Sequence, residues 1–404
     1  MASISSLKQR NMLAIIRVIK SKGVITKPEI AKVAGLTQST VHNFTNELLE
    51  RKIIVEDGIA ESNGGRKATT YCMNAERFYI IALDIGDSYI SICLHNLEFQ
   101  DKYSKSIPYI LQVRNIDEGL LDILNLIQEL LEQSQICKDD VLGIGVSISG
   151  TVDFPKGKVY QITNAPKWRN IPLAKMIEDG TGIQTIIDKD NNNAVLYYKA
   201  ENTSEKRNLV FFSTRKGIGT GLLIGGNVYR GSHCLAGEFG HMRIDYVGEV
   251  CKCGRVGCIE PLASDPSIVQ RVKQEIRGGA NSIVAEICSD KLEIVSLGVV
   301  IKAAQLGDLV ALDTLNNVAE YLSLALSNII KIYDPDEIIV DSVWLQSFID
   351  IFNTIKDNVY EDNSFLDRDR LTITLAKEDN IFLLGATSLI LDHHLNSYAS
   401  SRFL

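Results

Sequence analysis

The chain lacks the features that would place it in a membrane or outside a cell. No apolar run reaches the length needed to span a bilayer, and no secretory signal opens the sequence. We therefore expect a cytoplasmic protein with reduced thiols and no membrane partner. Hydrophobic content of 45% and charged content of 23% are ordinary for a globular protein, and 404 residues predict two or three domains.

An overall positive charge is also missing, but the negative charge is unevenly spread. The formal net charge is −8, yet residues 1–72 hold 11 Lys and Arg against 6 Asp and Glu. That segment is +5, so the remainder is −13. A basic head on an acidic body indicates that the head alone meets a polyanion. Chance asymmetry in a small segment is the alternative explanation.

Cysteine is scarce, but three of the eight cysteines fall within residues 251–258. Thiolates and a neutral imidazole are the preferred ligands of tetrahedral zinc. The sequence therefore predicts one structural Zn²⁺ per chain, held by His241, Cys251, Cys253 and Cys258.

A disulfide, free buried thiols and a catalytic zinc are the alternatives at this position. A Cys-x-Cys pair is too cramped for an easy internal disulfide, and four protein ligands leave no open position for catalysis. The remaining five cysteines are scattered, and we expect them to be small buried apolar residues. They are Cys72, Cys93, Cys137, Cys234 and Cys288.

The basic head has the organisation of a helix–turn–helix. Apolar residues recur at helical spacing over residues 7–19, and Gly23 ends that helix. Pro28 lies near the start of a second helix at 27–34, where its missing N–H costs nothing. After a tight turn at 35–37, residues 38–49 predict a third helix, with Val41, Phe44 and Leu48 facing inward.

Two short strands at 53–58 and 69–72 follow and predict a wing with a flexible, basic tip. A polar helix face and a basic wing suit base edges and phosphates, although a winged helix used for protein contact is the alternative. The expected DNA-contacting residues are Gln38, Ser39, Thr40, His42, Asn43, Asn46, Arg66 and Lys67.

Buried strands alternate with helices in the rest of the chain. Strands are expected at 79–86, 88–94 and 141–148, and an amphipathic helix at 117–134 points Leu121 and its apolar neighbours inward. Further strands begin at residue 209, and helices dominate after Ser264. The pattern predicts an α/β fold of two lobes with a cleft between them. We divide the chain into a winged helix–turn–helix domain (1–74), an N-terminal lobe (75–200) and a C-terminal lobe with the zinc motif (201–404).

Four stretches make the chain resemble the ROK family of repressors and sugar kinases, whose fold is two-lobed and actin-like or hexokinase-like. They lie at residues 143–153, 164–168, 190–194 and 237–260. The resemblance implies a pocket for a sugar or sugar phosphate, lined by Asn164, Asp190, Glu238, His241 and Glu260. Carboxylates and amides suit vicinal hydroxyls. Asp190 could instead cap a helix, and Glu260 could merely orient a zinc ligand.

The kinases of this family use the aspartate that matches Asp190 as general base, and this chain departs from their nucleotide loops. Asp87 replaces a glycine, Arg215 and Lys216 alter a second loop, and 340–342 read Val-Asp-Ser where glycines are usual. Lys189 stands where the family has Asn. Charge repulsion between Asp87 and a polyphosphate disfavours ATP. Arg215 and Lys216 could offset this repulsion, pair with Asp87, form surface salt bridges, or hold a phosphorylated sugar.

We therefore expect no catalytic residues and a sugar-responsive, DNA-binding regulator, most simply a repressor. A homodimer or dimer of dimers would place two helices 38–49 on a near-palindromic DNA operator. The alternatives are an ATP-dependent sugar kinase with a DNA-binding head, and a constitutive regulator that answers to a protein partner.

Overall fold

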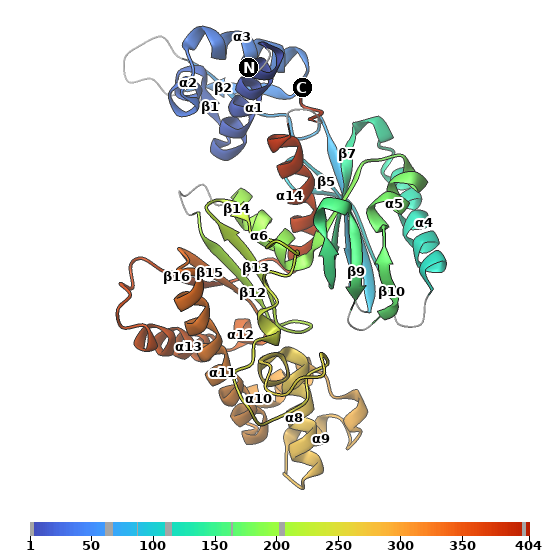
Figure 1. The fold of residues 1–404 in the computed structure, drawn as a ribbon, viewed down its shortest axis with the longest axis vertical. Coiled ribbons are helices and arrows are strands. Elements are labelled where there is room, and N and C mark those ends of the chain that lie inside the picture. The colour runs from blue at the N-terminus through green and yellow to red at the C-terminus, as the bar shows by residue number, and fades with distance from the viewer. Residues whose placement is uncertain are drawn as a thin grey trace. The chain divides into compact units, whose positions relative to one another are not determined.

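The computed structural model describes residues 4–60, 68–86, 88–109, 115–162, 165–201, 207–397 and 401–404 (Figure 1). The chain divides into two compact units. The first contains Met1–Glu205 and Asn380–Leu404, and the second contains Lys206–Asp379. Both units combine helices with a central sheet, so the predicted α/β class is confirmed.

The head, residues 4–73, has the predicted helix–turn–helix and wing. The helices begin and end close to their expected residues, and a two-residue strand that was not predicted pairs with the wing. The elements are α1 (Ile4–Lys22), β1 (Ile25–Thr26), α2 (Lys27–Ala34), α3 (Gln38–Glu50), β2 (Ile54–Ile59) and β3 (Thr69–Met73).

Local capping explains where the two short helices of the head begin. Thr26 and Glu29 form a reciprocal capping box, in which the Thr26 hydroxyl accepts from the Glu29 backbone and the Glu29 carboxylate accepts from Thr26. Gly35 ends α2 with φ of 64°, a left-handed conformation that favours glycine. Thr37 then caps α3 by accepting a hydrogen bond from the Thr40 backbone.

The head shares one apolar core with the body of the first unit. Leu48 and other inward residues of the head form a cluster that continues through Phe78 and Phe403. The rings of Phe78 and Phe403 lie 5.8 Å apart, edge to face. Arg17 donates to the Leu395 carbonyl at 3.0 Å, and Lys20 to the Leu97 carbonyl at 2.7 Å. The head is therefore packed against the body through both apolar and polar contacts.

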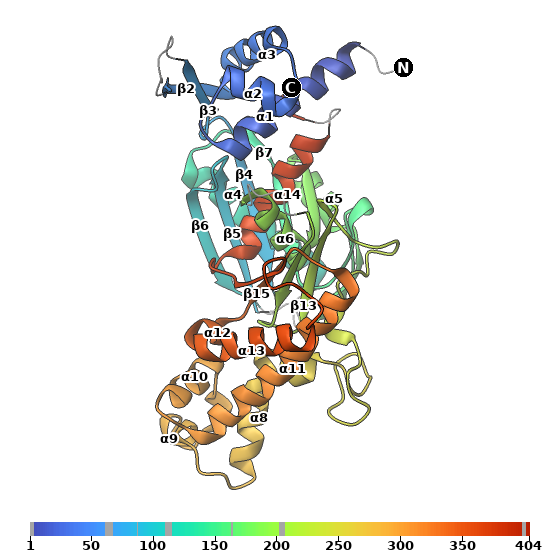
Figure 2. The same ribbon diagram turned by 90° about the vertical axis from the view of Figure 1, so that its left-hand side faces the viewer.

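A five-stranded sheet in the order β11-β7-β4-β5-β6 forms the centre of the first unit (Figure 2). Strands β4, β7 and β11 are parallel, and β5 and β6 extend the sheet as antiparallel strands. The bounds are β4 (Tyr79–Ile85), β5 (Tyr89–Asn96), β6 (Asp101–Pro108), β7 (Val141–Ile148) and β11 (Thr185–Lys189). A smaller antiparallel sheet contains β8 (Thr151–Asp153), β9 (Lys158–Ile162) and β10 (Ala165–Ile171).

The helices of the first unit are α4 (Ile116–Ser134), α5 (Leu173–Thr181), α6 (Asp190–Glu201) and α14 (Ile381–Asn396). Leu121 on α4 is 58% exposed, so the prediction that it points inward was wrong. Helix α14 packs so tightly on β7 that a Cβ at Gly145 would lie 2.0 Å from the Ala386 carbonyl oxygen. Residues 380–404 belong to the first unit, whereas the sequence division grouped them with the C-terminal lobe.

The second unit has a five-stranded sheet in the order β14-β13-β12-β15-β16. Its strands are β12 (Leu209–Ser213), β13 (Gly219–Ile224), β14 (Asn227–Val228), β15 (Glu337–Asp341) and β16 (Thr372–Leu375). Its helices are α7 (Glu260–Ala263), α8 (Asp265–Arg277), α9 (Ile283–Ile287), α10 (Leu297–Gln305), α11 (Leu309–Tyr333), α12 (Val343–Ser347) and α13 (Ile349–Asp362). In the part of the chain that the structure describes, no helix is long and apolar enough to cross a membrane.

Candidate functional site: a polar recognition helix and a histidine–cysteine centre

Helix α3 separates an apolar face from a polar face as the sequence predicts. Val41 and Leu48 are fully buried, and Phe44 is partly buried against the same core. The predicted contact residues lie on the other side: Gln38, Ser39, His42, Asn43 and Asn46 are exposed, and Thr40 is half-buried. This is the amphipathic pattern expected of a helix that packs on one side and meets a ligand on the other.

Two of these side chains are already held in place by neighbours. The Asn46 side-chain oxygen accepts from Lys27 Nζ at 2.9 Å, and its amide nitrogen lies 3.2 Å from His42 Nε2. These contacts orient the middle of the polar face from the preceding helix. Arg66 and Lys67, predicted at the wing tip, lie outside the described residues.

The metal segment, residues 237–260, lies against β13 because its glycines lack side chains. A Cβ at Gly237 would lie 2.1 Å from the Thr220 carbonyl oxygen, and one at Gly240 2.3 Å from that of Ile218. This close approach positions a 3₁₀ turn, Phe239–His241, whose Phe239 ring packs edge to face on Phe212 at 6.4 Å. His241 is thereby fixed at the start of the segment.

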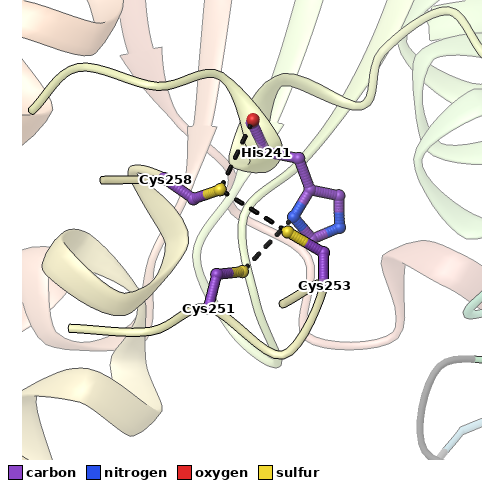
Figure 3. Close-up of side chains that lie close together, drawn as sticks. All are labelled: His241, Cys251, Cys253 and Cys258. Carbon is purple, nitrogen blue, oxygen red and sulfur yellow. Dashed lines mark hydrogen bonds between the residues drawn. The ribbon is translucent and has the colours of Figure 1, made fainter. Parts of the chain in front are cut away.

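The predicted ligands, His241, Cys251, Cys253 and Cys258, converge as Figure 3 shows, and their ligand atoms all lie within 4.8 Å of one another. Cys251 Sγ is 3.5 Å from His241 Nδ1, and Cys253 Sγ is 3.6 Å from Cys258 Sγ. A donor set of three thiols and one imidazole fits a tetrahedral, thiophilic metal ion. The four side chains can therefore bind a metal.

The three thiols do not ionise alike. Burial raises the pKa of Cys251 to about 12, and burial also raises the pKa of Cys258. Burial opposes ionisation of Cys253 too, but hydrogen bonds from Arg255 and from its two partner thiols lower the pKa of Cys253 to about 6. Cys253 is therefore a thiolate at neutral pH and can bind a metal directly. A metal would displace a proton from each of the other two thiols, Cys251 and Cys258.

The predicted sugar-binding residues are carried by both units. In the second unit, Glu238 is exposed beside the 3₁₀ turn, and Glu260 begins α7, where its carboxylate accepts from the Ile218 backbone at 3.3 Å. Glu260 also helps to raise the pKa of Cys251 by charge repulsion, so it adjoins the thiols.

In the first unit, Asp190 is buried at the junction of β11 and α6. Its carboxylate accepts from the backbone and the side chain of Asn191, at 2.7 and 2.8 Å. Asn164 lies outside the described residues. The described residues therefore do not establish a common binding site for Asn164, Asp190, Glu238, His241 and Glu260. Their role in sugar binding stays a prediction.

Comparison with protein-family models shows which family the chain belongs to. The ROK family model matches residues 80–392, and a model for winged helix–turn–helix DNA-binding domains matches residues 9–55. The chain belongs to the ROK family. The winged head and the actin-like body are therefore both confirmed, and the ROK match covers most of the described body.

Similar ROK proteins span nearly the whole chain. The xylose repressor of Caldicellulosiruptor bescii is 27% identical over 96% of this chain and 97% of its own length. The N-acetylglucosamine repressor of Escherichia coli O157:H7 is 26% identical, covering 98% and 95%.

Solved structures give the same picture of the fold. The crystal structure of a ROK family transcriptional regulator, described as a homologue of the E. coli MLC protein, matches with a TM-score of 0.81 and 26% identity over 98% of this chain and 97% of that chain. A ROK glucokinase from Streptomyces griseus matches 77% of this chain and 98% of its own length, with a TM-score of 0.65 and 22% identity. That second likeness is one of fold.

Two residues that the sequence led us to expect in altered nucleotide loops, Arg215 and Asp341, meet each other in the second unit. Arg215 Nε lies 2.7 Å from an oxygen of Asp341, whose side chain is fully buried at the end of β15. The same carboxylate accepts from the Ser213 hydroxyl at 2.9 Å, and Arg215 also donates to the Asp379 carbonyl at 3.2 Å. Both positions were noted in the sequence, but their pairing was missed. The opposite charges of Arg215 and Asp341 were the signal that could have revealed it.

The scattered cysteines are less uniform than expected. Cys93 and Cys288 are buried, Cys72 and Cys234 are half-buried, and Cys137 is exposed, so the prediction of general burial was wrong for Cys137. None of the described cysteines forms a disulfide. Asp87, which we also expected to alter a nucleotide loop, lies outside the described residues.

Proposed function

We propose that this ROK protein is a sugar-responsive transcriptional repressor that binds DNA through its head. The carrying observation is the exposed polar face of α3 on a winged head whose apolar core continues into a ROK body. The relatives named above as xylose and N-acetylglucosamine repressors span both parts of the chain, which supports one function for the whole.

The head would read DNA with α3 in the major groove. The proposed base and phosphate contacts are made by the outer-face residues, with a basic wing tip on the backbone: Gln38, Ser39, Thr40, His42, Asn43, Asn46, Arg66 and Lys67. A homodimer, or a dimer of dimers, would present two such helices to a near-palindromic operator.

The histidine–cysteine centre would hold one structural Zn²⁺ per chain. Three thiols and an imidazole match the ligand preference of zinc, and four protein ligands close the coordination sphere. The bound ion would supply a rigid cross-link, since residues 242–259 contain only isolated bridges among their described elements. His241 would face the metal with Nδ1 and keep Nε2 for another partner.

The effector would be a neutral sugar or a sugar phosphate of the pentose, hexose or aminosugar class. We assign Glu238, His241 and Glu260 of the second unit, with Asn164 and Asp190 of the first, to its hydroxyl groups. Sugar and operator would weaken each other's binding by the same factor, because linkage between two sites is reciprocal.

ATP-dependent phosphorylation is the rival function, favoured by the fold likeness to glucokinase. The Arg215–Asp341 pair argues against it, because a buried carboxylate already neutralises the cation in the altered loop. A polyphosphate bound at this loop would be repelled by the Asp341 carboxylate, or it would have to break the ion pair between Arg215 and Asp341. Asp190 would then be retained for sugar binding and not as a general base.

Fluorescence anisotropy would test this proposal. A labelled duplex, selected by the full chain from a random-sequence pool, is titrated with protein in the presence of xylose, glucose, N-acetylglucosamine or their phosphates. One sugar should release the DNA, and Asp190→Asn should abolish that response while leaving DNA affinity unchanged. Release by none of them would contradict the sugar model, and ADP formation that Asp190→Asn abolishes would establish the kinase instead.

A further inference from the structure

A second group of metal-ligating side chains lies in the first unit, away from the metal segment in sequence. Cys93 and His95 are two residues apart on β5, so both side chains project from the same face of the sheet. Asp101 begins β6 and pairs directly with His95 across the strands, next to a β-bulge. One ligand atom from each of the three lies within 4.8 Å of the other two.

Burial makes this convergence unusual. Cys93 and His95 are both fully buried, whereas the Asp101 side chain is 51% exposed. Cys93 packs with Leu383 and other apolar residues of α14 on the same face. The group is therefore reached from solvent only at its carboxylate side, as an ion-binding pocket with one open edge would be.

Both ring nitrogens of His95 have close polar neighbours. Its Nδ1 lies 2.7 Å from the Thr387 hydroxyl on α14. The same hydroxyl lies 3.1 Å from the Leu383 carbonyl and can donate to it. In the tautomer in which it does so, Nδ1 carries the hydrogen and donates to Thr387, and Nε2 presents a lone pair.

Nε2 faces the Asp101 carboxylate. It lies 3.0 Å from a carboxylate oxygen, close enough for a hydrogen bond or an ion pair when Nε2 carries a hydrogen. When Nε2 presents its lone pair instead, two acceptors face each other at this distance, and a cation between them removes the repulsion. The Cys93 sulfur is the third atom of the same group, and a thiolate, an imidazole and a carboxylate together suit a borderline metal ion.

We propose that Cys93, His95 and Asp101 form a second metal site, selective for Zn²⁺ and similar ions. Thr387 orients His95 through the nitrogen opposite the metal, the role that outer partners play at other metal centres. Three protein ligands leave a fourth position for water at the open, Asp101 side. Such a site exchanges its ion more readily than the closed centre at His241, and its occupancy cross-links β5 and β6 through Cys93, His95 and Asp101.

Cobalt titration of the full chain tests this site separately from the first. Zinc-loaded protein is desalted and titrated with Co²⁺, whose thiolate complexes absorb in the near ultraviolet. We expect a saturable cobalt–thiolate band in the wild type and in Cys137→Ser, a control that removes an exposed cysteine of the same unit. Cys93→Ser should abolish the band, and Cys258→Ser, which alters the first centre, should keep it.

Asp101→Asn is the second variant, because Asp101 is half exposed and its replacement leaves the core intact. It should weaken cobalt binding by roughly tenfold or more, as loss of an oriented carboxylate does at other metal sites. Unchanged affinity in Asp101→Asn, or a band that persists in Cys93→Ser, would overturn the proposal. So would a wild type without any band, since a proton between His95 and Asp101 would then explain the geometry.

Discussion

The head and the metal segment hold their functional side chains by different means. In the head, Leu48 and its neighbours bury one face of each helix, and Thr26 and Thr37 cap α2 and α3. The metal segment has only a 3₁₀ turn and two isolated bridges before α7. Glycine contacts position its first turn, and we propose that a metal ion held by four ligands fixes the rest. A buried core keeps most of its contacts when one side chain is shortened. A segment held by four metal ligands would have few other contacts to compensate for the loss of one ligand.

Loss of a thiol ligand should therefore have the largest effect. Cys258→Ser is expected to abolish tight zinc binding and to cost the second unit several kcal/mol, since structural zinc stabilises small folds by about 10 kcal/mol or more. Metal analysis and calorimetric unfolding measure both effects. Cys234→Ser, a half-buried cysteine of the same unit that is no ligand, is the matched control. Equal melting temperatures for Cys258→Ser and Cys234→Ser would contradict the idea that the metal segment depends on its ligands.

A cavity in the core of the head should have the next largest effect. Leu48 is fully buried, so Leu48→Ala should destabilise the protein by about 2–5 kcal/mol and weaken DNA binding. Zinc content should not change. Leu7→Ala removes an exposed leucine from the same head and should alter neither property. Loss of zinc in Leu48→Ala would show that the two regions are not independent.

The pH dependence of metal binding should distinguish the segment further. Cys251 and Cys258 have raised pKa values, so both thiols bind protons near neutral pH, while Cys253 is ionised above about pH 6. Metal binding then releases two protons, and zinc affinity should rise by up to about a hundredfold per pH unit between roughly pH 7 and 8.5. Competition with a chelator of known pH dependence measures this slope. A flat profile would mean that the thiols are already ionised.

The smallest effect is expected at the capping box of α2. Thr26→Ala removes the hydroxyl that caps the Glu29 backbone, at a cost of about 1 kcal/mol. Chemical denaturation should detect this change, and Thr26→Ser should restore most of the loss because serine also caps. A loss much above 2 kcal/mol would show that the head depends on local contacts as strongly as the metal segment does.

Local patterns account for what the sequence predicted well. Pro28, Gly35 and the apolar spacing of 38–49 define helices from neighbouring residues alone. The four predicted ligands of the metal segment lie within 18 residues of one another, so the pattern could be recognised from the sequence without knowledge of the fold. The positions of Glu238 and Glu260 beside them followed for the same reason.

Contacts between residues far apart in the chain account for what the sequence did not predict. Arg215 and Asp341 are 126 residues apart and meet because β12 and β15 are parallel neighbours. Cys93, His95 and Asp101 converge only once the register of β5 and β6, with its bulge, is known. Residues 380–404 join the first unit through contacts with distant residues, such as that of Ala386 with Gly145, which no periodicity reveals.

The ring of Phe403 has a consequence for biosynthesis. Residues 4–73 leave the ribosome before residues 401–404, but the cluster that buries Leu48 and Phe78 also contains Phe403, and Arg51 donates to the Leu404 carbonyl. The head of a nascent chain thus lacks part of its core until translation reaches the last described residues. Loss of residues 401–404 would leave the head with an open apolar flank, so Phe403 makes the packing of the DNA-binding head depend on residues that follow the second unit in the sequence.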